Sequence, residues 1–579
     1  MIFQPEFLSS DTPLAEYPRP QMKRDSYLSL NGKWEYAIRK HPAPARFDGE
    51  IVVPYSPECK LSGVEKQLKN DEYLIYRRYF TLPNGFFRGR VLLNFGAVDQ
   101  LCEAFVNGVL VGSHEGGYLP FTFDITDELQ SGENELIVIV KDDASSDVYG
   151  RGKQSYKRGG IWYTATSGIW QSVWLESVPE NYIKSVKLTP DYDTKRLTVR
   201  CEVVGELGDG KGVSVSVTDG ERVVATVYSD GAEATVDVSA CKEWTTDAPE
   251  LYGVSVHYGD DSVESYFGLR KFSVLQKGGK KYFALNGKPI FHNGLLDQGY
   301  WHEGLYTPPS NEAMYEEIKA VKSLGFNMLR KHIKIEPLLW YYYCDILGVL
   351  VWQDMINGGG KYPKLRIMLA PFINLHLRDG NYKKMRRSER SREQYYAEAY
   401  GTIDALYNCV SLCLWTPFNE AWGQFDALNV CEELKKKDPT RLYDHASGWQ
   451  DMGGGDVYSR HIYFRKLKAK NDGKRVFALT EFGGYSYAVE GHIFSKKKFG
   501  YKKFRSAEKL RAAYENLYRE QVLPLIQKEG LCGAVYTQLT DVEDEVNGLY
   551  TFDRVLKVDE KELQKINAAV YAAFNKASK

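Results

Sequence analysis

The stretch Cys409-Val-Ser-Leu-Cys-Leu-Trp-Thr-Pro-Phe-Asn-Glu-Ala-Trp-Gly423 decides the fold of this chain. Its first half is an unbroken apolar run, which is typical of a strand buried on both faces, as in a parallel sheet. The run ends abruptly in Pro417, Asn419 and Glu420. In a (β/α)8 barrel, catalytic residues lie at the C-terminal ends of the strands, so Glu420 is a candidate catalytic carboxylate. If the Asn419-Glu420 pair stood alone, a solvated glutamate after a core strand would be the simpler interpretation.

A second stretch of the same build changes that interpretation. Arg475-Val-Phe-Ala-Leu-Thr-Glu-Phe-Gly-Gly484 is again an apolar strand that ends in a carboxylate, Glu481, and then in glycines. Two strand-end glutamates in one barrel supply the pair of carboxylates that glycoside hydrolysis needs. The sequence therefore favours a catalytic role for both.

These two motifs resemble glycoside hydrolase family 2, which includes β-galactosidases, β-glucuronidases and β-mannosidases. The resemblance implies that Glu420 is the acid/base and that Glu481 is the nucleophile of a retaining mechanism. Such a mechanism requires carboxyl groups about 5–5.5 Å apart.

The chain of 579 residues is too long for one core, and we expect three domains. Residues 1–180 predict a β jelly-roll sandwich like the sugar-binding domain of the family, residues 181–278 an immunoglobulin-like β-sandwich, and residues 279–579 a C-terminal (β/α)8 TIM barrel. Asn-Gly pairs at 31–32 and 107–108 each predict a hairpin turn.

In the third domain, strands alternate with helical stretches, which favours βα units. A hairpin over 281–292 leads into the first strand. Further strands are expected at 326–330, 349–354, 409–416, 441–446, 456–463, 475–481 and 533–538, and helices at 310–324, 506–528 and 561–574. The long basic stretch 358–393 follows the third strand, and we expect it to overhang the active site.

Composition indicates which partners and which compartment the chain has. The formal net charge is −1, so bulk charge indicates neither a nucleic-acid nor a membrane partner. We see no signal peptide and no apolar run approaching the roughly 18 residues of a membrane span. The nine cysteines are scattered without a Cys-x-x-Cys pair, which favours reduced thiols. We expect a cytoplasmic protein with no metal and no cofactor; whether it forms a homo-oligomer is left open.

Several further residues are candidates for substrate binding. Through the resemblance, Asn419 would bind the hydroxyl next to the anomeric carbon, Tyr463 and Arg330 would hold Glu481 ionised, and His332 would lie close by. The histidine His461 is a rim residue rather than a metal ligand on its sequence context. The hydroxyl ligands proposed from strand ends are Asp297, Gln298 and Asp354, and the proposed stacking platforms are Trp301 and Trp449; packing at the barrel rim is the alternative for all five.

The sequence predicts an exo-acting retaining glycosidase that removes a terminal β-linked sugar from an oligosaccharide or small glycoside, with a β-galactoside as the leading substrate. A β-glucuronidase, an arabinosidase or a catalytically inactive carbohydrate-binding protein are the alternatives. β-Glucuronidases of this family carry an Asn-x-Lys after strand eight, whereas this chain has Asn547-Gly-Leu549. Another lysine (Lys331, Lys334 or Lys361) would then have to bind an acidic sugar.

Overall fold

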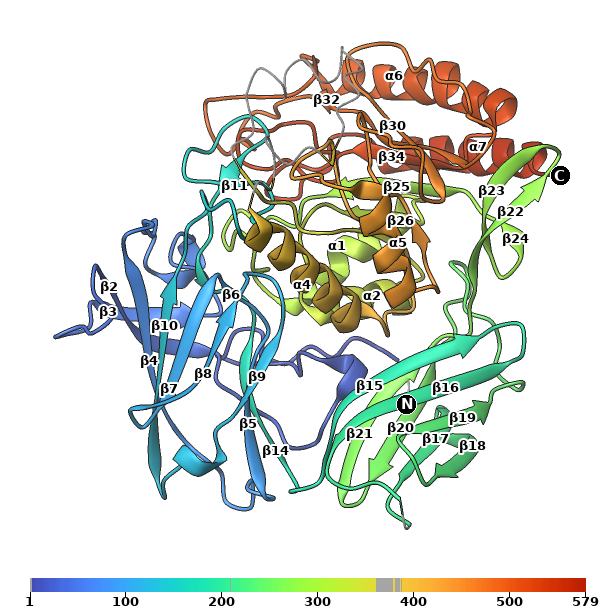
Figure 1. Ribbon diagram of the computed structural model, residues 1–579. Coiled ribbons are helices and arrows are strands. Elements are labelled where there is room, and N and C mark those ends of the chain that lie inside the picture. Colours follow the sequence, from blue (N-terminus) through green and yellow to red (C-terminus); the bar gives the residue numbers. More distant parts are fainter. Residues whose placement is uncertain (1–2, 209, 361–378, 381–385, 387) are drawn as a thin grey trace.

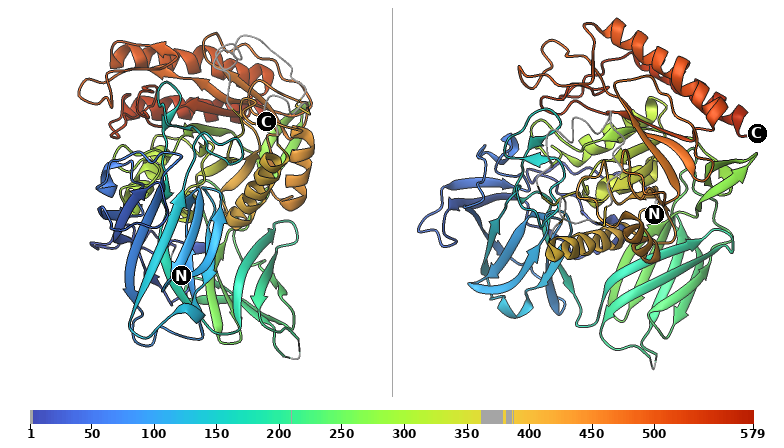
Figure 2. Two further views of the ribbon diagram at one scale, coloured as in Figure 1. Left: turned by 60° about the vertical axis from the view of Figure 1, so that its left-hand side comes forward. Right: turned by 45° about the horizontal axis from the view of Figure 1, so that its top comes forward.

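The computed structural model describes residues 3–208, 210–360, 379–380, 386 and 388–579. Two β domains lie side by side against a barrel, the N-terminal one in blue and cyan and the second in green (Figure 1). The two further views keep this arrangement (Figure 2). The fold class predicted from the sequence is confirmed.

The N-terminal domain is a sandwich of two antiparallel sheets around a core that includes Trp34, Tyr76 and Phe95. The four-stranded sheet has the order β1 (Leu28–Ser29), β14 (Val173–Val178), β5 (Arg90–Phe95) and β9 (Phe121–Asp124). The six-stranded sheet has the order β3 (Gly49–Val53), β2 (Gly32–Arg39), β4 (Tyr73–Thr81), β10 (Glu133–Lys141), β7 (Leu101–Val106) and β8 (Val109–Glu115). Short pairs join β11 (Gln154–Ser155) to β12 (Tyr163–Thr164), and β6 (Val98–Asp99) to β13 (Gly168–Ile169).

One of the two predicted hairpins is confirmed and the other is wrong. Asn107 and Gly108 both have positive φ, 51° and 83°, and join the paired strands β7 and β8, as a type I′ turn requires. At Asn31, by contrast, the chain crosses from one sheet to the other, because β1 pairs with β14 and β2 pairs with β3 and β4. The Asn31 side chain stabilises this connection between the sheets. Its Nδ2 donates to the Leu14 carbonyl and to Ser172 Oγ, and its Oδ1 accepts from the Val173 N–H.

The second domain is a smaller antiparallel sandwich with its own valine-rich core. One sheet contains β15 (Tyr182–Asp191), β16 (Arg196–Val204) and β19 (Glu233–Asp237). The other contains β18 (Arg222–Ser229), β17 (Val213–Asp219), β20 (Tyr252–Tyr258) and β21 (Asp261–Phe267).

The third domain is an eight-stranded parallel barrel. Its strand order is β29 (Leu442–Tyr443), β28 (Leu412–Thr416), β27 (Leu350–Asp354), β26 (Met328–Lys331), β25 (His292–Asp297), β34 (Gly533–Thr537), β31 (Val476–Gly483) and β30 (Val457–Ile462). The preceding hairpin is β22 (Phe272–Lys277), β23 (Lys280–Leu285) and β24 (Lys288–Pro289), and β32 (Tyr485–Ser486) pairs with β33 (Lys502–Lys503). The helices are α1 (Asn311–Ser323), α2 (Leu338–Leu347), α4 (Glu389–Leu406), α5 (Ala427–Lys437), α6 (Ala507–Leu517) and α7 (Glu560–Ala577).

Local sequence explains where these helices begin and end. The Ser310 hydroxyl accepts from the Ala313 N–H and caps α1, as predicted. The helix predicted over 506–528 is found as one continuous helical run, which is α-helical at Ala507–Leu517 and then contains π-helical turns at Tyr518–Val522 and Leu525–Glu529. Pro524 lies between these turns, and it cannot donate an N–H to the helical ladder.

The domains share apolar contacts with the barrel. Trp170 of the N-terminal domain is fully buried and packs against Tyr306 of the barrel, with ring centroids 5.2 Å apart, and Trp244 of the second domain belongs to the same core cluster. All nine cysteines lie in the described part of the chain, where each is buried and free of disulfides. None of the described helices combines the length and the apolar composition that crossing a bilayer requires.

Candidate active site

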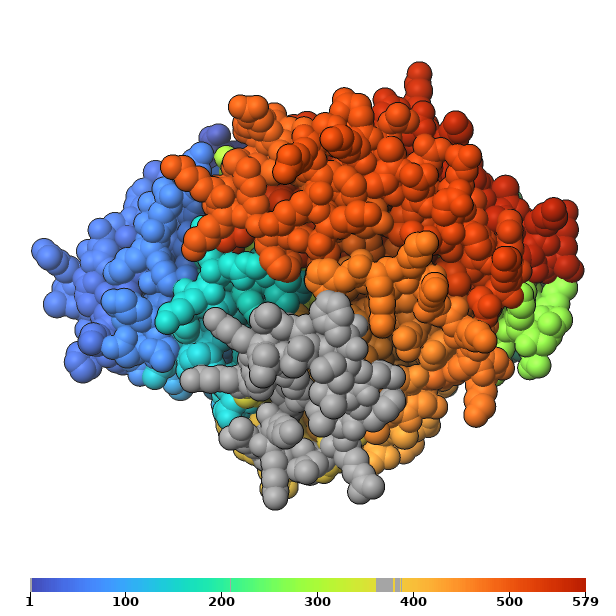
Figure 3. Space-filling model, turned by 90° about the horizontal axis from the view of Figure 1, so that it is seen from above, coloured from blue at the N-terminus to red at the C-terminus, as the bar shows by residue number. Residues whose placement is uncertain are grey.

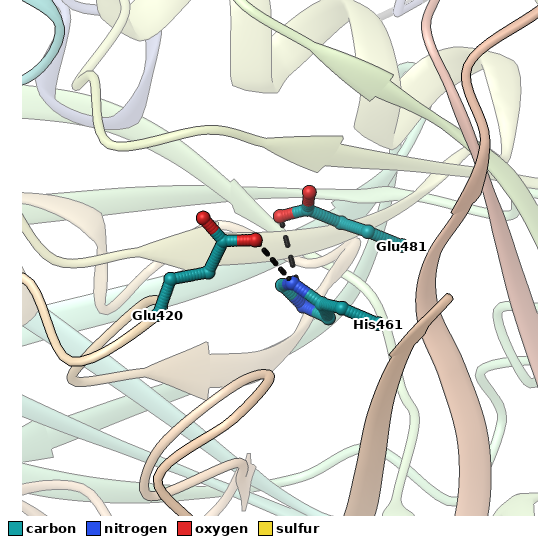
Figure 4. Close-up of side chains that lie close together, drawn as sticks. All are labelled: Glu420, His461 and Glu481. Atoms are coloured by element: carbon teal, nitrogen blue, oxygen red, sulfur yellow. Dashed lines mark hydrogen bonds and ion pairs between the residues drawn. The ribbon is translucent and has the colours of Figure 1, made fainter. Parts of the chain in front are cut away.

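The two strand-end carboxylates converge at the C-terminal mouth of the barrel. Glu420 follows β28 and Glu481 lies in β31. One oxygen of each carboxylate and one ring nitrogen of His461 all lie within 4.8 Å of one another, and the carboxylates point toward each other with the imidazole beside both (Figure 4). This proximity matches the short carboxyl separation of retaining glycosidases.

Glu481 is surrounded by hydrogen-bond donors. Nη1 of Arg330 lies 3.1 Å from Oε1 of Glu481, and the Tyr463 hydroxyl donates to Oε2. The residue is only 4% exposed. Tyr463 is itself fixed by stacking on Tyr501, with ring centroids 4.1 Å apart and ring planes within 9°. The Glu481 carboxyl group is therefore held in one orientation.

Glu420 has different surroundings. Its backbone is left-handed, with φ 50°, a conformation that costs free energy for a residue with a side chain and that occurs often at functional sites. Burial raises the pKa of Glu420, and the charges of Lys153, His332 and Arg330 oppose that rise. This carboxyl is therefore favoured to hold a proton.

His461 is the partner of Glu420. Its Nδ1 lies 2.8 Å from Oε1 of Glu420, and its Nε2 lies 2.9 Å from Oγ of Ser447. Burial lowers the pKa of His461 to about 3, so the ring is neutral. A neutral imidazole next to a hydroxyl can either donate to an ionised Glu420 or accept from a protonated one, because the Ser447 hydroxyl can serve Nε2 in either role.

Gly448 makes this close approach feasible. Its φ is +101°, and a Cβ at this position would lie 3.0 Å from Nδ1 of His461 and 3.3 Å from Cγ of Glu420. Any side chain there would push the imidazole and the carboxylate apart. The sequence analysis did not identify Gly448, because its role depends on contacts with residues distant in the sequence.

Arg330 connects the base of the site. Besides Glu481, it binds Asp354 with two hydrogen bonds of 3.0 Å and donates to Oδ1 of Asn419 at 2.9 Å. Burial opposes ionisation of Asp354, but Arg330 and His332 together lower its pKa. Burial in turn lowers the pKa of His332, whose Nδ1 lies 2.8 Å from Asp354. Among the described residues, Nδ2 of Asn419 has no protein acceptor, so it is free to donate to a ligand.

Other predicted residues have structural partners instead. Asp297 uses Oδ1 for the Gly299 N–H and Oδ2 for Lys331, and Gln298 donates to Gln538. Neither arrangement leaves the side chain directed at a sugar, so we omit both from the proposed substrate site. Lys331 and Lys334 are likewise buried in ion pairs with Glu336, which corrects the suggestion that they bind an acidic sugar.

The aromatic candidates separate in the same way. Trp449 is half-buried and contacts His461 edge-on, with centroids 5.3 Å apart, which places it at the site. Trp301 lies under the Arg554 guanidinium and lines a separate cavity of about 330 Å³, which corrects its prediction as a stacking platform. The sequence analysis did not identify the pair Trp162 and Trp422, whose rings stack with centroids 5.2 Å apart, Trp422 being two residues after Glu420. Lys361 and most of the loop 358–393 lie outside the described residues.

A metal could be held at one place in the described part of the chain. Glu420, His461 and Glu481 offer two carboxylates and one imidazole at suitable separations. The hydrogen bond between His461 and Glu420 accounts for this grouping without an ion. We therefore keep the expectation that the protein uses no metal, and it remains untested.

Family models match consecutive parts of the chain. Residues 27–179 match the sugar binding domain of glycosyl hydrolases family 2, residues 181–270 match the model named glycosyl hydrolases family 2, and residues 277–572 match its TIM barrel domain. The last match alone covers more than half of the chain.

Relatives and solved structures agree with this assignment. A β-galactosidase of Halalkalibacterium halodurans is 25% identical over 467 residues, covering 72% of this chain and 43% of that protein; the chain spans about half the length of the curated relatives that it matches. A family 2 β-galacturonidase from Eisenbergiella tayi bound to glycerol superposes with a TM-score of 0.69 at 19% identity, covering 96% of this chain and 98% of that one. A β-D-glucuronidase of Dictyoglomus thermophilum superposes with a TM-score of 0.74 at 18% identity, covering 95% and 98%. These structures support the fold, and with the family models they lead to one conclusion: the chain belongs to glycosyl hydrolases family 2.

Proposed function

We propose that this family 2 protein is a retaining exo-β-glycosidase in which Glu481 is the nucleophile and Glu420 the acid/base. One observation carries the proposal: a buried glutamate and a half-buried one meet at the barrel mouth with unlike partners, cationic and phenolic at Glu481 and a neutral imidazole at Glu420. Environments that differ in this way separate a permanently ionised carboxylate from one that holds a proton.

In the first step, a Glu481 oxygen attacks the anomeric carbon as the bond to the leaving oxygen breaks. The Glu420 proton passes to that oxygen. In the second step, Glu420 takes a proton from water, the water oxygen attacks the anomeric carbon, and the bond to Glu481 breaks. Nδ1 of His461 lies beside Oε1 of Glu420 and would hold that carboxyl group in place during both steps.

Two groups beside the carboxylates would position the sugar. Nδ2 of Asn419 is free to donate to the hydroxyl next to the anomeric carbon, while Oδ1 is fixed by Arg330. Trp449 offers a half-buried ring beside His461. The N-terminal domain borders the barrel face, as the teal surface next to the orange surface shows (Figure 3), which favours attack at chain ends.

Two kinds of terminal sugar are candidates. A β-galactoside is favoured because Leu549 stands where the resemblance expects a uronate-binding lysine, and the first curated relative is called a β-galactosidase. A β-hexuronide is favoured because two solved structures that correspond to nearly the whole chain are titled a β-galacturonidase and a β-D-glucuronidase. A lysine of the N-terminal domain, Lys153, favours the β-hexuronide.

The test is hydrolysis of a panel of 4-nitrophenyl β-glycosides, followed by trapping with 2-deoxy-2-fluoro glycosyl fluorides. We expect turnover of at least one β-glycoside, the β-anomer as the first product by NMR, and a fluoroglycosyl adduct on the peptide that contains Glu481. An α-anomer as first product would exclude retention. The absence of turnover and adduct with every sugar would favour a carbohydrate-binding protein.

A further inference from the structure

A segment of the N-terminal domain is joined to the barrel mouth by its backbone. Gly150 forms an antiparallel bridge with Gly358, and the N–H groups of Arg151 and Gly152 both donate to the Asn357 carbonyl, at 2.9 and 3.0 Å. Gly152 has φ +58°, and a Cβ there would lie 2.8 Å from the Ile333 carbonyl oxygen. The segment is therefore held against the loops that follow Arg330 and Asp354.

This docking fixes the position of Lys153, the next residue. Lys153 is 7% exposed, and its carbonyl accepts from the Tyr163 N–H at 3.1 Å. Its ammonium lies 5.5 Å from the centre of the Tyr163 ring. Its charge lowers the pKa of both Glu420 and His332, against burial in the first case and together with burial in the second. The ammonium is therefore close to the catalytic pair although it comes from another domain.

No partner accounts for this charge within the described part of the chain: Nζ of Lys153 has no hydrogen-bond acceptor there and no carboxylate within ion-pairing distance. The neighbouring anion Glu545 accepts instead from Tyr163 and from Nδ2 of Asn547. Glu420 must be protonated when substrate binds, so it does not neutralise the ammonium at that stage. A largely buried ammonium without an anionic partner is costly, and an anionic group on a ligand would offset that cost.

We propose that Lys153 binds the carboxylate of an acidic sugar, so that the enzyme hydrolyses β-linked hexuronides in preference to the corresponding neutral hexosides. This inference rests on the proposed glycosidase function and identifies its substrate class. Two other candidate positions in the described part of the chain are unsuitable, because Leu549 is apolar and Lys331 is paired with Asp297 and Glu336. The selectivity for charge would therefore come from the N-terminal domain rather than from the barrel.

The experiment compares matched pairs of nitrophenyl substrates: β-glucuronide with β-glucoside, and β-galacturonide with β-galactoside. The members of each pair differ only at the carbon outside the ring, so their ratio of kcat/KM isolates the carboxylate. The variants are Lys153→Met, Lys153→Arg, which keeps a charge, and Lys157→Met, which removes an exposed lysine from the same loop. Unchanged Tm values would show that each variant is folded.

We expect the wild type to prefer the uronide of one pair by about 100-fold, since charged hydrogen bonds contribute roughly 1.5–3 kcal/mol. Lys153→Met should lose about 100-fold on that uronide and less than 3-fold on the neutral partner. Lys153→Arg should retain part of the preference, and Lys157→Met all of it. Equal losses on both substrates, or a wild type that prefers the neutral hexoside, would overturn the inference while leaving the glycosidase in place. Absence of turnover of all four substrates and of a trapped intermediate would instead refute the proposed function.

Discussion

The two carboxylates of the proposed site face each other, yet they belong to different kinds of structure. Glu481 lies within strand β31, where the pairing with both neighbouring strands shifts register, and its partners Arg330 and Tyr463 are both barrel residues. Glu420 lies after its strand, in a left-handed conformation, beside a neutral histidine and near a lysine of another domain. Glu481 is therefore held by a guanidinium and a phenol of the barrel, whereas Glu420 lies in a loop beside an imidazole.

The difference shows how one residue type can take two chemical roles. A nucleophile must be ionised and aimed at one carbon throughout the reaction, which a salt bridge and a phenol within the barrel core provide. An acid/base must gain and lose a proton, which burial and a partner that tolerates both states provide. The following changes would break or sharpen this contrast.

Replacing the nucleophile should have the largest effect. Glu481→Gln keeps the shape of the side chain but removes the attacking oxygen anion, so no glycosyl-enzyme can form and kcat should fall by about 10⁴-fold or more. Rapid-quench mass spectrometry with an activated substrate measures the intermediate. The control is Glu490→Gln, an exposed glutamate after the same strand. An increase in the mass of the intact Glu481 variant after reaction with substrate would show that another group attacks the anomeric carbon.

Replacing the acid/base should give a smaller and substrate-dependent loss. In Glu420→Ala, dinitrophenyl substrates need no proton on departure and should still form the intermediate, whereas glycosides with poor leaving groups should lose about 10³-fold. Deglycosylation then lacks its base, so the intermediate should accumulate. Azide needs no deprotonation and should restore turnover, giving the β-glycosyl azide. An α-azide from this variant would reverse the two assignments.

The sequence predicted the barrel strands and both carboxylates because these signals are local. An apolar run buried on both faces, such as 409–416, must be a central strand, and its first polar residues must emerge at the barrel mouth. Asn107-Gly108 was predictable for the same reason, since its turn is set by two adjacent residues. Asn31-Gly32 has the same two residues, but the Asn31 side chain forms hydrogen bonds with Ser172 and Val173, which are distant in the sequence. Tertiary contacts decided that case.

The residues that the sequence did not reveal are those defined by two distant segments. The sequence around Lys153 contains no motif that marks it as a site residue. Lys153 lies at the barrel mouth because Gly150 pairs with Gly358. Asp297 looked like a sugar ligand because it ends a strand, but its oxygens are taken by Lys331 and the Gly299 N–H. Position at a strand end predicts which side chains reach the mouth, and the partners they find there are settled by packing.

A change at Gly448 should disturb only the Glu420 side. Gly448→Ala would place a Cβ 3.0 Å from His461 and 3.3 Å from Glu420, and a displacement of this kind should lower kcat/KM by about 10- to 100-fold. The control is Gly453→Ala, because Gly453 also has a positive φ, +87°, but a Cβ there meets nothing within 4 Å. Both variants should lose about 1 kcal/mol of stability from backbone strain. If both lose activity equally, strain rather than the contact is responsible.

The smallest expected effect is a shift in the pH profile of Lys153→Met. The Lys153 charge favours ionised Glu420 and so lowers the pKa of that carboxyl; removing the charge should raise that pKa. Because Glu420 must be protonated to assist the leaving group, kcat/KM falls as pH rises through its pKa, and the basic limb should move to higher pH. The measurement uses whichever nitrophenyl glycoside the variant still hydrolyses, with Lys153→Arg and Lys157→Met as controls that should keep the wild-type limb. A basic limb that stays in place in Lys153→Met, or moves to lower pH, would mean that the N-terminal domain does not act on the acid/base. The contrast between the two carboxylates would then arise within the barrel alone.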